Sequence, residues 1–129
     1  MSEGVRDTVL VVDDSEDFRE LIVMIGRLYG VPVLQAADCR QALNVLSHEC
    51  SKIKLIMLDY FMPGMTPAMC VDALREKGGP SVNIVLVTAI ADPAVRAAEL
   101  QISRWIAKPV EPSTLRELMT QDSWFRKPA

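Results

Sequence analysis

The sequence lacks long apolar runs and any targeting segment at its start. No stretch approaches the roughly 18 consecutive apolar residues of a membrane span. The N-terminus has no cationic start followed by an apolar run, the pattern that marks a signal peptide. These absences predict a soluble, cytoplasmic chain with no membrane contact.

The sequence also lacks an excess of basic residues. Lys and Arg number 14 against 17 Asp and Glu, and the formal net charge is −3. Domains that depend on nucleic-acid phosphates usually carry a basic excess or a basic stripe. We therefore expect no direct nucleic-acid partner, although an acidic chain can still bind DNA locally.

Cysteines are few and form no pairing motif. Cys39, Cys50 and Cys70 are odd in number, include no C-x-x-C, and each falls in a stretch with helical periodicity. This pattern predicts reduced thiols in the core and no disulfide, in agreement with a cytosolic compartment.

Apolar content, by contrast, is ample. Hydrophobic residues make up 50% of the 129 residues and charged residues 24%. This composition excludes a disordered chain, which is rich in charge and poor in hydrophobic residues. Repeats and linkers are absent from the sequence, so we predict a single domain over residues 1–129, frayed after residue 121.

Short apolar runs alternate with segments of helical periodicity. Continuous runs of Val, Ile and Leu are typical of strands buried on both faces, and they cover residues 8–12, 31–35, 53–58, 82–87 and 104–107. Each run is followed by a helical segment, starting near residues 16, 38, 67, 93 and 112. Such alternation predicts an α/β fold, with parallel strands joined by right-handed crossovers.

Capping residues mark the helix boundaries. Ser15, Thr66 and Asp92 precede helical segments as candidate N-caps, and Gly30 is a candidate stop. The first helix is predicted to carry one apolar face, formed by Phe18, Leu21, Ile22, Ile25 and Leu28.

Polar side chains follow four of the predicted strands. Asp13 and Asp14 follow the first strand, Asp59 the third, Thr88 the fourth and Lys108 the fifth. Sites in open α/β sheets form at the carboxyl ends of the strands, so we expect these side chains to converge.

The chemistry of such a cluster points to phosphoryl transfer. Clustered carboxylates repel one another, and Mg²⁺, which prefers oxygen ligands, relieves the repulsion. Lys108 can pair with a phosphoryl oxygen, and the Thr88 hydroxyl can donate a hydrogen bond to one. A carboxylate in these surroundings is suited to accept a phosphoryl group.

Four sequence fragments resemble the receiver domains of two-component response regulators, of the kind found alone in small chemotaxis regulators. The fragments are Val11-Val12-Asp13-Asp14-Ser15, Leu58-Asp59-Tyr60-Phe61-Met62-Pro63-Gly64-Met65, Val87-Thr88-Ala89 and Trp105-Ile106-Ala107-Lys108-Pro109. The resemblance covers about residues 7–121. It implies a flavodoxin-like, doubly wound sheet of five parallel strands in the order 2-1-3-4-5, with five helices.

The resemblance also implies a role for each site residue. Asp59 would be the phosphoacceptor, and Mg²⁺ would be held by Asp13, Asp14, Asp59 and the backbone carbonyl of Phe61. Lys108 would pair with the phosphoryl group, and the peptide bond between Lys108 and Pro109 would be cis.

A switch and partners are implied as well. Thr88 and Trp105 would move together and reshape the surface of the fourth helix, fifth strand and fifth helix. A histidine kinase or phosphotransfer protein would donate the phosphoryl group, and a downstream protein would bind the altered face. The resemblance leaves open whether the domain forms a phosphorylation-dependent homodimer. The domain would act only on itself, so it is not expected to be an enzyme.

The sequence departs from the family pattern at two places. The spacing from Thr88 to Lys108 is two residues shorter than usual, and Gln101-Ile102-Ser103 replaces the usual Gly-Ala. Phe61 and Ile90 are apolar where many members have polar residues, and we hypothesise an altered phosphoryl lifetime.

Three alternative functions would use a related α/β fold. A pseudo-receiver would use the same fold as a phosphorylation-independent interaction module, but the acidic pair, Asp59, Thr88 and Lys108 are all present. A haloacid-dehalogenase-like phosphatase would need D-x-D-x-T after the first strand. That motif is absent, because Asp13 is followed by Asp14 and Ser15. A flavin-binding domain would need a phosphate loop there, where Asp13 and Asp14 would repel the phosphate.

Overall fold

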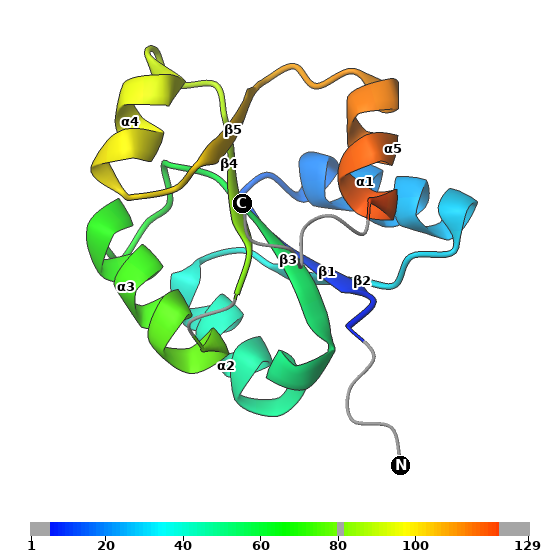
Figure 1. Ribbon diagram of the computed structural model, residues 1–129, viewed down its shortest axis with the longest axis horizontal. Coiled ribbons are helices and arrows are strands. Elements are labelled where there is room, and N and C mark those ends of the chain that lie inside the picture. The colour runs from blue at the N-terminus through cyan, green and yellow to red at the C-terminus, as the bar shows by residue number, and fades with distance from the viewer. Residues whose placement is uncertain (1–5, 80–81, 122–129) are drawn as a thin grey trace, which may run out of the picture.

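Five parallel strands form one sheet with helices on both faces, as the computed structural model shows for residues 6–79 and 82–121 (Figure 1). The strands are β1 (Thr8–Val12), β2 (Val33–Ala36), β3 (Ile53–Leu58), β4 (Ile84–Thr88) and β5 (Arg104–Ala107). The helices are α1 (Glu16–Tyr29), α2 (Cys39–Glu49), α3 (Pro67–Gly78), α4 (Pro93–Glu99) and α5 (Pro112–Thr120), with a short 3₁₀ turn, η1 (Cys50–Lys52). The strand order β2-β1-β3-β4-β5 confirms the predicted fold class.

The sheet separates two helical layers. Helices α1 and α5 cover one face, and α2, α3 and α4 cover the other (Figure 1). All residues of β1, β3 and β4 are buried, so these strands are covered on both faces. Alternate residues of β1 therefore enter different cores: Leu10 packs with the α2–α3 layer, and Val11 packs with the α1–α5 layer.

Most of the predicted helix boundaries are confirmed. The Ser15 hydroxyl accepts a hydrogen bond from the Phe18 amide, and Thr66 accepts one from Met69. Gly30 ends α1 in the left-handed region, at φ 72°, where glycine carries no steric penalty. Asp92 is the N-cap of α4, as predicted, but it adopts φ 55° and its side chain makes no capping hydrogen bond.

Two further expectations about the elements were wrong. Leu21 and Leu28 do not share the packed face of α1, because they are 40% and 70% exposed. Ile22 is fully buried, and Phe18 and Ile25 pack beside it. A helix laid on a sheet buries only a stripe of its surface, and Leu21 and Leu28 lie outside that stripe. Strands β2 and β4 also begin two residues later than predicted, at Val33 and Ile84.

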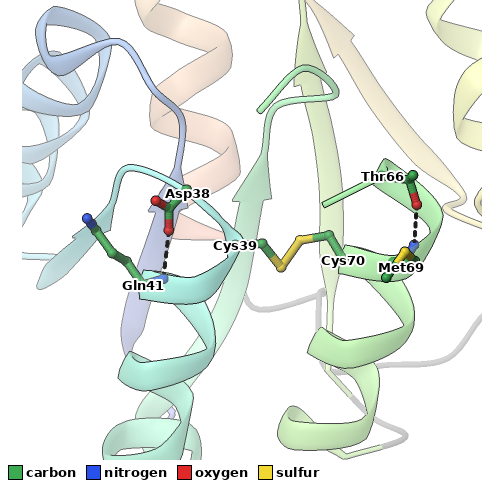
Figure 2. The surroundings of a disulfide bond; sticks show 6 residues. All are labelled: Asp38, Cys39, Gln41, Thr66, Met69 and Cys70. Atoms are coloured by element: carbon green, nitrogen blue, oxygen red, sulfur yellow. Dashed lines mark hydrogen bonds between the residues drawn. A yellow bond between two sulfur atoms is a disulfide. The ribbon is translucent and has the colours of Figure 1, made fainter. Parts of the chain in front are cut away.

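The expectation of reduced thiols fails for two of the three cysteines. Cys39 and Cys70 form a disulfide that joins α2 to α3 (Figure 2). Only Cys50 is a free thiol within the described residues. The pair is 31 residues apart in sequence, and the fold alone brings its two Cα atoms to 5.9 Å.

None of the helices in the described part of the chain is long and apolar enough to cross a membrane. The fraying expected after residue 121 lies outside the described residues.

Candidate functional site

The register of the sheet brings the predicted site residues to one edge. Val12 on β1 pairs with Leu58 on β3, so the next residues, Asp13 and Asp59, leave adjacent strands side by side. The Asp59 amide continues the ladder by donating to the carbonyl of Val12 at 3.0 Å. Backbone pairing thus fixes where each of the two carboxylates starts.

Strands β4 and β5 deliver Thr88 and Lys108 to the same edge. Thr88, the last residue of β4, pairs with Ala107 on β5. The Lys108 amide donates to the Thr88 carbonyl at 2.9 Å, and the Lys108–Pro109 peptide bond is cis, as expected.

Asp13 is the most enclosed acid of the cluster. Its residue is 1% exposed, and both carboxylate oxygens accept hydrogen bonds. Oδ1 accepts from the Ser15 amide at 2.9 Å, and Oδ2 accepts from Nζ of Lys108 at 2.5 Å. A buried carboxylate is tolerated only with such partners, so Asp13 is held in place by its charge partner and by the turn into α1.

Asp59, whose side chain is 11% exposed, is subject to competing electrostatic influences. Burial raises the pKa of its carboxyl group, and the negative charge of Asp13 adds to the rise. A hydrogen bond from the Thr88 hydroxyl and the positive charge of Lys108 lower the pKa in part. The net direction is upward from 3.8, so the site disfavours the ionised form of Asp59 until positive charge is added.

The donor set suits a divalent cation. Carboxylate oxygens of Asp13, Asp14 and Asp59 lie within 4.8 Å of one another. Asp14 is exposed and Asp13 is buried, so the cluster opens toward solvent on one side. Mg²⁺ prefers hard oxygen ligands and keeps several waters, and an open cluster of carboxylates provides both conditions.

Lys108 approaches the cluster from β5, across the ends of β4 and β3. Its Nζ lies 3.9 Å from Oδ2 of Asp59 and 4.3 Å from the centre of the Phe18 ring. The aromatic face stabilises the ammonium group, and Asp13 orients it. The lysine therefore lies within reach of any group attached to Asp59.

Other predicted residues lie around the cluster or farther from it. Phe61 is 63% exposed, and its ring makes an edge-to-face contact with Tyr60 at 5.4 Å between centroids. Trp105 is 43% exposed on β5, beside a hollow of about 340 Å³ that is also lined by Thr114 and Leu118.

Sequence reasoning missed two contributors to the site. Nη1 of Arg19 donates to the backbone carbonyl of Asp13 at 2.8 Å and so fixes the turn that presents the acid. Phe18 was assigned only to packing, although its ring also lies against Lys108. Both residues follow Asp13 within the first turn of α1, and that proximity was the available signal.

Comparison with known proteins identifies the family. The family model described as the response regulator receiver domain matches residues 9–120. An uncharacterized 14.6 kDa protein of Leptolyngbya boryana is 32% identical over 116 residues, which cover 88% of this chain and 87% of that protein. The phosphate regulon transcriptional regulatory protein PhoB of Pseudomonas aeruginosa is 30% identical over 114 residues, 86% of this chain and 49% of PhoB.

Solved structures similar to this chain support the same family. The chemotaxis response regulator CheY4 of Vibrio cholerae is 28% identical, with a TM-score of 0.77 over 89% of this chain and 97% of that one. The chain therefore belongs to the response regulator receiver domain family. It spans about half the length of several of the curated relatives that it matches.

Proposed function

We propose that this domain is the phosphoacceptor of a two-component or phosphorelay pathway, with Asp59 as the residue that is phosphorylated. The observation that carries the proposal is the convergence of three carboxylates, a hydroxyl and an ammonium group at one sheet edge. Family membership provides independent support, because homologues include response regulators such as PhoB.

In the proposed reaction, the ionised Asp59 carboxylate attacks the phosphorus of a donor phosphoryl group. A bond forms between a carboxylate oxygen and phosphorus, and the bond from phosphorus to the donor breaks. Because burial raises the pKa of Asp59, this residue needs positive charge close by before it can react as a carboxylate.

Each neighbouring residue has a proposed part. Asp13 and Asp14, with Asp59 and the Phe61 carbonyl, would hold Mg²⁺, which when bound neutralises carboxylate charge and the charge spread over the phosphoryl oxygens. Lys108 would move the short distance from Asp13 toward a phosphoryl oxygen on Asp59. The Thr88 hydroxyl, which lowers the pKa of Asp59, would donate to the same phosphoryl group.

The proposed signalling context follows from this chemistry. A histidine kinase or phosphotransfer protein in the cytoplasm would supply the phosphoryl group, and a downstream protein would read the changed surface. The exposed Trp105 on β5 and the hollow beside it provide a face for that reading. The domain would catalyse only its own phosphorylation and dephosphorylation, and would not turn over an external substrate as an enzyme does.

The proposal is tested by incubating the protein with acetyl phosphate and recording its intact mass. We expect the gain of one phosphoryl group in millimolar Mg²⁺, none in EDTA, and none for Asp59→Asn. The matched control is Asp72→Asn, which makes the same change at an exposed acid on α3 and should leave the gain intact. Failure of the wild type to gain mass with Mg²⁺ would favour a pseudo-receiver instead.

A further inference from the structure

The Cys39–Cys70 disulfide joins the first turns of two neighbouring helices (Figure 2). Cys39 is the first residue of α2, directly after its N-cap Asp38. Cys70 lies in the first turn of α3, and its amide donates to the carbonyl of the N-cap Thr66 at 3.0 Å. Both cysteines are only 2% exposed. The bond therefore holds the starts of α2 and α3 together within the core.

These helix starts lie at the same edge of the sheet as the acidic cluster, because each helix begins after the carboxyl end of a parallel strand. The segment from Asp59 to Thr66 runs from the phosphoacceptor position directly into α3. Asp59 is anchored at one end of this segment by β3, and the disulfide fixes the other end through α3. The covalent bond thus limits how far the segment beside Asp59 can move.

Helix α3 also holds the turn that follows α4. Arg75 donates through Nη1 to the carbonyl of Leu100 at 3.0 Å and through Nη2 to that of Gln101 at 2.6 Å. A displacement of α3 would therefore shift both the segment beside the acidic cluster and the turn into β5.

We propose that Cys39 and Cys70 form a reversible redox site whose closed state restrains the segment between Asp59 and Thr66. The expectation of reversibility rests on the proposed function, since a domain that receives phosphoryl groups from a kinase works in the reducing cytoplasm. Disulfides in that compartment are usually transient and catalytic or redox-sensing.

The opening step is thiol–disulfide exchange with a dithiol reductant. One reductant thiolate attacks a sulfur of the pair, the bond between Cys39 and Cys70 breaks, and the released cysteine leaves as a thiolate and takes up a proton. The second reductant thiol then attacks the mixed disulfide. The products are two cysteine thiols and the oxidised reductant, and closure by a disulfide oxidant is the reverse.

The reduced form retains a place for both thiols. Cys39 and Cys70 belong to the core cluster that includes Ala42, Val71 and Leu74, and a free cysteine packs there as a small apolar side chain. The reduced domain therefore stays folded. Its unfolded chain is no longer cross-linked and gains conformational entropy, which lowers the stability of the fold. For this loop length we expect the midpoint of thermal unfolding to fall by about 10 °C on reduction.

The first test counts thiols in a Cys50→Ser background, where only the pair can react. The native protein is equilibrated with glutathione redox buffers or dithiothreitol, quenched with acid, then unfolded and alkylated, and its intact mass is recorded. We expect no alkylation under oxidising conditions, two alkylations under reducing conditions, and recovery of the first state on reoxidation. Two free thiols in the presence of oxidant would overturn the proposal, and so would a bond that dithiothreitol opens only in denaturant.

The second test measures amide hydrogen exchange between residues 60 and 66 in the two redox states. We expect exchange to be several-fold faster in the reduced protein and in Cys39→Ala/Cys70→Ala, whatever the redox buffer. Equal exchange in both states would overturn the claimed restraint. Asp59 phosphorylation is recorded on the same samples: its failure in both states counts against the proposed function and leaves the thiol result unaffected.

Discussion

Lys108 pairs more closely with Asp13 than with Asp59. Its Nζ lies 2.5 Å from Oδ2 of Asp13 and 3.9 Å from Oδ2 of Asp59. The lysine thus neutralises the more buried acid, whose side chain is 2% exposed, and leaves Asp59 with the weaker share of its charge. Asp59 therefore keeps a negative charge that is only partly compensated when it ionises, and it can take up further positive charge.

Removing the lysine tests this pairing. Lys108→Gln leaves the buried Asp13 carboxylate without its cation, and we expect the free energy of unfolding in EDTA to fall by about 2 kcal/mol. This is less than the ~3–5 kcal/mol for breaking a fully buried pair, because the Lys108 side chain is 20% exposed. Urea denaturation provides the measurement.

Lys52→Gln is the matched control for that change. Lys52 pairs with Glu49 at 3.4 Å on the surface, with the two side chains 60% and 35% exposed, so its removal should cost less than about 0.5 kcal/mol. Equal effects of the two substitutions would show that the Lys108–Asp13 pair contributes no more than a surface contact.

Neutralising Asp59 should stabilise the metal-free protein at neutral pH. Burial raises the pKa of Asp59 above its unfolded value, so the folded state prefers the protonated acid, and ionisation is unfavourable for folding. Asp59→Asn removes this cost. Its advantage should be absent below pH 3.8, grow as pH rises through the folded-state pKa, and stay constant above it.

The measurement is the difference in unfolding midpoint between the wild type and Asp59→Asn in EDTA across the pH range. We expect the variant to unfold a few degrees higher at pH 7 and at the same temperature near pH 3. A lower midpoint for the variant at pH 7 would contradict the account of Asp59.

The Thr88 hydroxyl should hold the pKa of Asp59 below the value that burial alone would give. Thr88→Val removes the hydroxyl with little change in shape, and we expect the pKa of Asp59 to rise. Thr88→Ser keeps the hydroxyl and should leave the pKa near its wild-type position. An NMR titration of the Asp59 carboxyl carbon measures this pKa in both variants. An unchanged pKa in Thr88→Val would show that the Thr88 hydroxyl does not act on Asp59.

Arg75 should stabilise the turn between α4 and β5. Arg75→Gln loses two hydrogen bonds to the carbonyls of Leu100 and Gln101, and we expect a loss of about 1–2 kcal/mol in unfolding free energy. The amide of Ile102, which donates to Ala97 in this turn, should exchange faster. Arg40→Gln, at an exposed position on α2, is the control, and equal effects would refute the role of Arg75.

Much of the fold and the cluster was predictable because it depends on local patterns. Buried strands appear as continuous apolar runs, and Asp13 and Asp59 directly follow two of them. Strand register then places the acids together without further information. The sequence pattern therefore predicted the residues of the candidate site, and the sheet order followed from the family resemblance.

Features that depend on how elements meet were not predictable. The approach of Cys39 to Cys70 depends on the packing of α2 against α3, which cysteine spacing does not encode. The exposure of Leu28 depends on which stripe of α1 meets the sheet. The preference of Lys108 for Asp13 depends on a difference of about 1.4 Å between distances of 2.5 and 3.9 Å, among side chains that meet only in the folded chain.

The most direct test of the central claim identifies the modified residue. The protein is phosphorylated with acetyl phosphate and Mg²⁺, treated with borohydride, which reduces an aspartyl phosphate to homoserine, and digested for peptide mass spectrometry. The account predicts homoserine at position 59 alone, and none in EDTA. Homoserine at position 13 or 14, or none at all in Mg²⁺, would contradict the assignment of Asp59 as phosphoacceptor.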